Sequence, residues 1–128
     1  MNPTTRVIFG KRNIIDTEIG IFNRASKSID TCMTYTRPSL AVSLRPIKDA
    51  FLAAKRKGVR LRYITEINHH NFEDCKVLQS IVHELRHLDG VKTNFMIQTQ
   101  HNLTQYLNRN NVPTYFMNGY WQIFHIVV

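Results

Sequence analysis

Apolar residues recur at helical spacing over residues 45–57 and then alternate with charged residues over 59–67. The helical face repeats at i, i+3, i+4 and i+7 and comprises Ile47, Ala50, Phe51 and Ala54. Pro46 suits the first turn of a helix, and Gly58 suits the left-handed position that ends one. This stretch predicts a helix that leads directly into a strand, which is half of a βαβ unit.

The same two periods predict five further elements: a strand or extended lead-in at 6–10, a helix at 13–25, a strand at 28–35, a helix at 72–88 and a strand at 91–97. Asn71 and Asp74 resemble a capping box before the second of these helices, and Gly90 ends it. With right-handed crossovers, the order β-α-β-α-β predicts an α/β fold with a parallel, doubly wound sheet and a preceding N-terminal helix.

Residues 98–128 differ in composition from residues 1–97. They are rich in Gln and Asn up to position 111, and no Asp or Glu follows Asp89. An aromatic stretch comes next, comprising Tyr115, Phe116, Tyr120, Trp121 and Phe124. Two interpretations stay open, a final strand at 121–128 or a divergent, poorly ordered tail of a fragment or altered reading frame. We therefore expect a domain at 1–97 and a separate tail at 98–128.

The length and composition limit the classes of protein to which this chain can belong. The chain has 128 residues, of which 43% are hydrophobic, so it can bury one core. No apolar run approaches the roughly 20 residues that a membrane helix needs, and the N-terminus lacks a signal-peptide pattern. Cys32 and Cys75 stand alone, which is typical of buried thiols in a cytoplasmic protein.

The net charge of +8 raises the alternative of a nucleic-acid-binding module. The densest basic group comprises Lys55, Arg56, Lys57, Arg60 and Arg62. Basic residues also collect at helix C-termini for electrostatic reasons, and no aromatic platform is interleaved with these. Nucleic acid is therefore the second interpretation of function.

Residues 83–87, HELRH, match the HExxH pattern of zinc hydrolases, in which two histidines bind the metal and the glutamate activates its water. The third ligand position of the extended pattern is Thr93, which is a poor substitute for His. On the predicted helix, His83 and His87 also lie opposite the apolar stripe, in solvent. We therefore expect no metal site here. His69 and His70 are neighbours in a loop, where histidines are usually only solvated.

Four segments together carry a resemblance to a known family: RVIFG at 6–10, YTRPSLA at 35–41, VRLRYITEI at 59–67 and ELRHLDGVK at 84–92. Over about three-quarters of its length the chain resembles the N-terminal input region of archaeal sensor histidine kinases, best known from ammonia-oxidising archaea. The resemblance implies a phospholipase-D-like α/β fold and a sensory role in two-component signal transduction. Relatives commonly carry Asp where His83 stands, which makes HExxH an accident of one substitution.

The chain also lacks features of this family and of the phospholipase-D enzymes that share its fold. No kinase catalytic region is present, so the resemblance implies at most a detached sensor half. Phospholipase-D enzymes use HxKxxxxD, and none of the six histidines has Lys two positions later. We expect no enzymatic activity, no catalytic residues and no cofactor.

In a doubly wound sheet the ligand crevice lies at the carboxyl ends of the parallel strands. That places five candidate ligand-binding residues together: Tyr35, Arg37, Ser39, Glu66 and Asn68. Arg37 would bind an anion, and Glu66 would orient it. The sequence therefore predicts a non-catalytic sensory module whose partner is a small ligand or a protein, with a homodimer as an open alternative.

Overall fold

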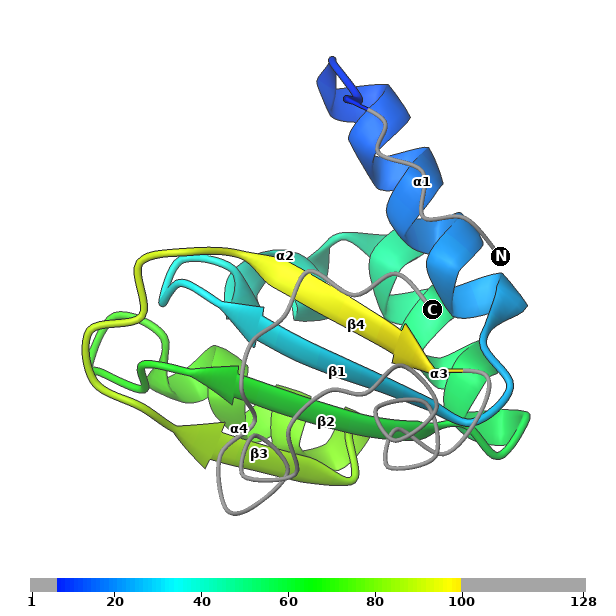
Figure 1. Cartoon of the computed structure of the whole chain (residues 1–128). Coiled ribbons are helices and arrows are strands. Elements are labelled where there is room, and N and C mark those ends of the chain that lie inside the picture. Colours follow the sequence, from blue (N-terminus) through cyan, green and yellow to red (C-terminus); the bar gives the residue numbers. More distant parts are fainter. Residues whose placement is uncertain (1–6, 100–128) are drawn as a thin grey trace, which may run out of the picture.

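The structure, a computed structural model, describes residues 7–99 (Figure 1). In chain order its elements are α1 (Lys11–Arg24), β1 (Ser28–Met33), α2 (Pro38–Ser43), α3 (Arg45–Arg56), β2 (Arg60–Thr65), α4 (Phe72–Ile81), β3 (Glu84–His87) and β4 (Phe95–Thr99). The predicted strand or lead-in at 6–10 forms no strand over residues 7–10. Apart from Gln98 and Thr99, the predicted tail lies outside the described residues.

The four described strands form one mixed sheet in the order β3-β2-β1-β4. β1 and β2 are parallel, with Ser28 opposite Arg60, and β2 and β3 are also parallel. β4 runs antiparallel to β1, with Cys32 opposite Phe95. The described helices contact one another and cover one face of the sheet, behind it in Figure 1. The α/β class is confirmed, but within residues 7–99 the arrangement has two layers and is not the doubly wound, wholly parallel sheet that we predicted.

The helix and strand predicted at 45–67 are present as α3 and β2. The apolar face of α3 is buried, and Pro46 lies in its first turn. Gly58 has a φ of 90°, so it occupies the left-handed conformation that lets the chain turn out of the helix. The main chain then enters the sheet, where the Arg60 N–H donates to the Lys27 carbonyl at 2.9 Å.

The predicted helix at 72–88 is wrong in its second half. α4 ends at Ile81, where Val82 becomes extended with ψ 162°. The chain then pairs with the outer edge of β2, since the His83 N–H donates to the Leu61 carbonyl and the Leu88 N–H to the Thr65 carbonyl. Pairing satisfies backbone groups of β2 that a continuing helix would leave without partners. β3 is therefore the third parallel strand, and it occupies residues that we assigned to a helix.

The strand predicted at 91–97 is also corrected. Residues 91–94 are irregular, and β4 begins at Phe95 and runs to Thr99. The turn around Gly90, which has a φ of 71°, leads the chain back across the sheet to the free edge of β1. Because β3 already occupies the edge of β2, this strand pairs with the edge of β1 instead, and it runs antiparallel to β1.

The main core lies between the helices and the sheet. The Phe22 and Phe51 rings lie 4.4 Å apart between centroids, and the Phe51 and Tyr63 rings 6.4 Å. A smaller apolar cluster on the other face of the sheet comprises Cys32, Ile64, Phe95 and Ile97. No helix within residues 7–99 is long and apolar enough to cross a membrane.

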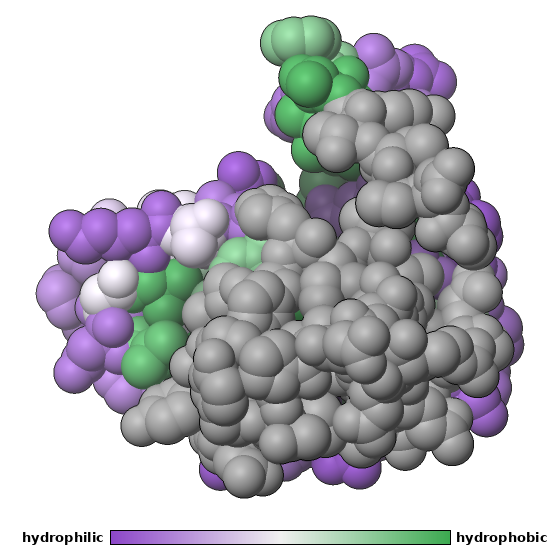
Figure 2. Space-filling view, viewed as in Figure 1, coloured by the Kyte–Doolittle hydropathy of each residue, from purple (hydrophilic) through white to green (hydrophobic). Residues whose placement is uncertain are grey.

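The N-terminal part of α1 projects beyond the sheet (Figure 1). Apolar side chains remain exposed at this end of the described chain, with 77% of Phe9 and 50% of Ile14 accessible to solvent. Figure 2 shows the corresponding green surface at the top of the molecule. The C-terminal half of α1 packs on α3, so one helix joins an exposed apolar surface to the core.

Candidate ligand-binding site

Asn71 organises the loops at the carboxyl ends of the parallel strands. Its side-chain Nδ2 donates to the carbonyl oxygens of Tyr35 at 2.9 Å and Glu66 at 2.8 Å. Its Oδ1 accepts from the Asn68 N–H at 2.9 Å. Asn71 makes no side-chain cap to α4, so the predicted capping box is wrong. The residue instead ties together the loops that follow β1 and β2.

Four of the five predicted ligand-binding residues lie in or beside these loops, with Ser39 in the first turn of α2. Tyr35 lies beside the His70 ring, with centroids 5.9 Å apart, and the Ser39 hydroxyl donates to the Thr36 carbonyl at 3.0 Å. A Glu66 carboxylate oxygen accepts from the Gly90 N–H, and the Asn68 side chain accepts from the His70 N–H, each at 3.0 Å. These four residues make internal contacts that shape the loops.

Arg37, the fifth predicted residue, lines a separate pocket. The pocket lies between α1, the start of α2, α3 and the sheet, and has a volume of about 290 Å³. We call it the α1 pocket. Its apolar wall includes Ile14, Ile21, Met33, Leu40, Ile47 and Phe51. The volume is close to the roughly 300 Å³ at the lower end of the range for small-molecule sites.

Three polar side chains of the α1 pocket stand out against its apolar wall. Glu18 of α1 and Arg37 are the charged lining residues among those described. Burial raises the pKa of the Glu18 carboxyl, although the positive charge of Arg37 acts in the opposite direction. Thr31 is only 1% exposed, and within the described part of the chain its hydroxyl oxygen has no hydrogen-bond partner. The pocket therefore combines apolar surface with a cation, an acid and an unsatisfied hydroxyl.

Asn94 is a further polar residue that lines the α1 pocket. Its Oδ1 accepts from the main-chain N–H of Thr34 at 2.8 Å and from the Thr34 hydroxyl at 3.2 Å. Asn94 immediately precedes β4 and also lines the pocket. These bonds join the end of β1 to the start of β4, whose first residues Phe95 and Met96 also line the pocket.

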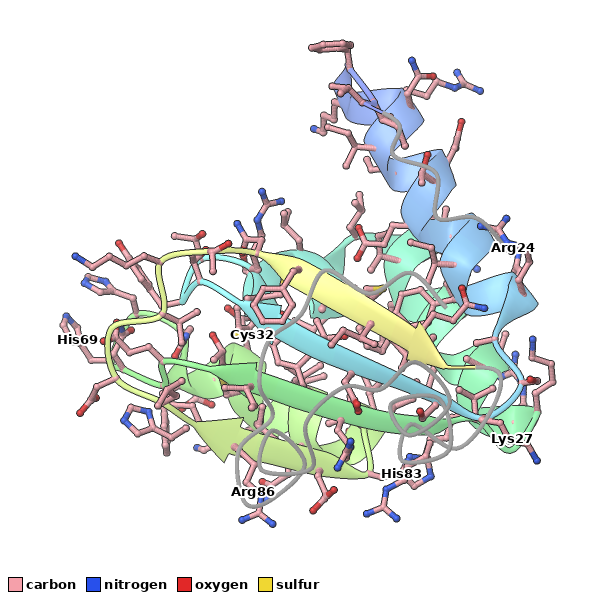
Figure 3. All side chains as sticks on the ribbon, in the orientation of Figure 1. Arg24, Lys27, Cys32, His69, His83 and Arg86 are labelled. Atoms are coloured by element: carbon pink, nitrogen blue, oxygen red, sulfur yellow. The ribbon has the colours of Figure 1, made fainter. Side chains whose placement is uncertain are left out.

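The histidines of the HExxH pattern belong to an extended edge segment of the sheet rather than to a helix, and His87 is the last residue of β3. His83 precedes β3, and its Nδ1 accepts from the Leu61 N–H at 3.0 Å (Figure 3). His87 accepts from the Ile67 N–H through Nδ1 at 2.9 Å, and its Nε2 lies 2.8 Å from an Asp89 carboxylate oxygen. The helical spacing that we assumed for this motif is therefore wrong. Within residues 7–99 no group of three metal-ligating side chains is brought together.

The basic residues of the nucleic-acid alternative are dispersed. Lys55 donates to the Ser80 carbonyl at 3.2 Å, and Lys57 to the Asn23 carbonyl at 2.6 Å. On the sheet face opposite the helices, Arg60 pairs with Glu84 at 3.0 Å and Arg62 with Asp30 at 2.7 Å. Arg56 is exposed at the end of α3. Four of the five side chains thus have intramolecular partners.

Other basic residues lie near one end of the sheet. Figure 3 places Arg24 and Lys27 at the end where β1 begins, and His69 at the opposite end. The α1 pocket is lined by neither Arg24 nor Lys27. The structure therefore separates these basic side chains from the loops that carry the predicted ligand-binding residues.

No protein-family model matches the chain. No curated protein sequence is significantly similar to it. The resemblance to archaeal sensor histidine kinases therefore stays a prediction from the sequence, and the α/β sandwich of residues 7–99 defines the class of fold.

Proposed function

We propose that this chain is a non-catalytic sensory module that binds a small ligand in the α1 pocket. The observation that carries the proposal is a cavity of about 290 Å³ whose wall is largely apolar and whose few polar groups converge from α1, β1 and the loop before α2. Small-molecule sites commonly have this composition, because apolar contact supplies affinity and a few polar groups fix orientation.

The position of the α1 pocket suits a sensor. α1 supplies one wall and packs against α3, while its other end projects beyond the sheet (Figure 1). A ligand that contacts both α1 and the sheet would favour one arrangement of the two, and an output region could detect that arrangement. Membership of a two-component histidine kinase is the part of the proposal that rests on the resemblance.

Binding of a neutral apolar dye, N-phenyl-1-naphthylamine, tests the proposal on the full chain. We expect saturable fluorescence enhancement with one dye per chain. Thr17 lines the pocket from α1, so Thr17→Trp should fill the cavity and abolish the enhancement. Asp16→Trp is the matched control, because the Asp16 side chain is 64% exposed on the same helix.

Each result of the dye-binding experiment either supports or refutes the proposal. Dye binding that is lost in Thr17→Trp and kept in Asp16→Trp supports a ligand site in the α1 pocket. Wild-type protein without saturable binding, or equal binding by the two tryptophan variants, would overturn the proposal. Circular dichroism of both variants checks that each retains the helix and strand content of the wild type.

A further inference from the structure

The Thr31 hydroxyl indicates that the α1 pocket is built for a polar ligand. Thr31 lies in the middle of β1 and is almost completely buried, yet its hydroxyl oxygen has no hydrogen-bond partner among residues 7–99. Buried polar groups in folded proteins are nearly always paired, since an unpaired one loses its hydrogen bonds to water and gains none in return. Because Thr31 is one of the residues that line the pocket, a ligand that reaches its hydroxyl can supply the missing acceptor.

Arg37 gives the pocket a preference for negative charge. Arg37 is an exposed residue that lines the pocket. Within residues 7–99 its guanidinium makes no hydrogen bond or ion pair. Guanidinium groups bind carboxylates through charge-assisted hydrogen bonds that are about twice as strong as neutral ones. An anionic ligand could therefore pair with Arg37 without first displacing a hydrogen-bond or ion-pair partner.

Glu18, which also lines the pocket, opposes this preference only in its ionised form. Burial raises the pKa of its carboxyl, which favours the neutral acid over a second negative charge beside the ligand. The neutral acid can also donate a hydrogen bond. The remaining wall is dominated by aliphatic and aromatic side chains, which favour an apolar body for the rest of the ligand.

We infer that the α1 pocket binds a small apolar monocarboxylate, whose carboxylate pairs with Arg37 and accepts a hydrogen bond from the Thr31 hydroxyl. This inference rests on the proposed function and adds the chemical class of the ligand. Medium-chain and small aromatic carboxylates fall within that class.

Three matched eight-carbon compounds test the charge preference by displacement of N-phenyl-1-naphthylamine from the full chain. Octanoate should bind about tenfold more tightly than octanol or octylamine, because it alone gains an ion pair with Arg37. Arg37→Gln should remove that preference and leave octanol binding unchanged. Arg45→Gln is the control for net charge, since the Arg45 side chain is 91% exposed and is not part of the pocket.

Thr31→Val tests the interior contact, because valine keeps the shape and removes the hydroxyl. Octanoate binding should weaken about fivefold, as expected for the loss of one hydrogen bond. If the dye binds but the three compounds displace it equally, or if Arg37→Gln leaves the preference for octanoate unchanged, the carboxylate assignment is overturned. The proposal that the α1 pocket binds a small ligand is then not affected. If Thr31→Val leaves the affinity unchanged, the interior hydrogen bond is overturned. Absence of dye binding to the wild type refutes the proposed function itself.

Discussion

Asn71 and Tyr35 are 36 positions apart in sequence, yet the side-chain amide nitrogen of Asn71 donates to the Tyr35 carbonyl oxygen at 2.9 Å. The same nitrogen donates to the Glu66 carbonyl oxygen at 2.8 Å. One buried amide therefore fixes the loop after β1 against the loop after β2. The path from Tyr35 into α2 includes Arg37, so this bond also restricts where that side chain can lie.

Asn71→Ala should lower the free energy of unfolding by about 3 kcal/mol, because it leaves buried backbone groups without partners. Asn71 is 2% exposed, so water does not readily replace the lost bonds. Urea denaturation measures the change. The control is Asn68→Ala in the same turn, which removes a single acceptor for the His70 N–H and should cost less than about 1 kcal/mol. Equal effects for the two variants would contradict the central role of Asn71.

Asp30→Asn should lower the free energy of unfolding by about 1–3 kcal/mol. Arg62 donates to both carboxylate oxygens of Asp30, each at 2.7 Å, across neighbouring parallel strands. The two side chains are 8% and 28% exposed for Asp30 and Arg62, respectively, so the substitution removes the negative charge from a well-buried ion pair. Chemical denaturation with urea gives the value directly.

The exposed pair Arg45–Asp49 provides the comparison for this measurement. Its atoms lie 3.8 Å apart, and the side chains are 91% and 64% exposed. Asp49→Asn should change stability by less than about 1 kcal/mol, because solvent screens exposed ion pairs. If Asp30→Asn and Asp49→Asn lower the free energy of unfolding equally, burial does not strengthen the Asp30–Arg62 pair.

The sequence predicted the elements whose apolar pattern and end signals agree. Over residues 45–67 the helical face, Pro46 and Gly58 all indicate the same boundaries, and α3 and β2 follow them closely. α1 also matches its predicted helix to within two residues at each end. Local pattern is sufficient here because each of these elements buries one face against the same core.

The helix predicted at 72–88 failed because tertiary pairing decides the structure of its second half. Leu85 has helical spacing from Leu78 and Ile81, so periodicity alone continues the helix. β3 is only four residues long and has no fully buried side chain, so it gives almost no period-two signal. The reversed direction of β4 depends in turn on where β3 lies, and no local pattern records that.

The candidate site was only partly accessible from the sequence. Arg37 was predicted as an anion contact and lines the α1 pocket, but Glu18 and Thr31 were not predicted. Glu18 does carry a signal, because it follows Ile14 by four positions and precedes Ile21 by three, which places it on the apolar face of α1. The missing bond of Thr31 depends on the packing around β1 and has no sequence signature.

His83→Ala and His87→Ala should each accelerate hydrogen exchange at one backbone amide of the neighbouring strand or its end. The Leu61 N–H donates to Nδ1 of His83, and the Ile67 N–H donates to Nδ1 of His87. Loss of an acceptor should raise exchange at Leu61 in the first variant and at Ile67 in the second, by about fivefold for one hydrogen bond. NMR-detected exchange resolves the two amides.

His83→Asn is the matched control for the first of these variants, because the asparagine Oδ1 lies as many bonds from the backbone as Nδ1. It should restore much of the protection at Leu61. If neither alanine variant changes exchange at its own amide, or if both change the two amides equally, the histidines do not act as local acceptors.

Glu18→Gln should stabilise the chain at neutral pH, and the gain should shrink as the pH falls. Burial raises the folded-state pKa of Glu18 above its unfolded value, so folding favours the protonated acid. The stability that this proton contributes is complete below the unfolded pKa and is lost as the pH rises through the folded pKa. Glutamine keeps the neutral form at every pH, so the two proteins should differ most above the folded pKa.

Thermal unfolding of both proteins over a pH series measures this difference, and Glu73→Gln on the exposed surface of α4 controls for the loss of one negative charge. The Glu73 side chain is 81% exposed, so its substitution removes charge without changing the α1 pocket. A Glu18→Gln protein that is less stable than the wild type at neutral pH would mean that the attraction of Arg37 for an ionised Glu18 outweighs burial. The carboxylate would then compete with an anionic ligand for Arg37, and octanoate binding should strengthen in the same variant.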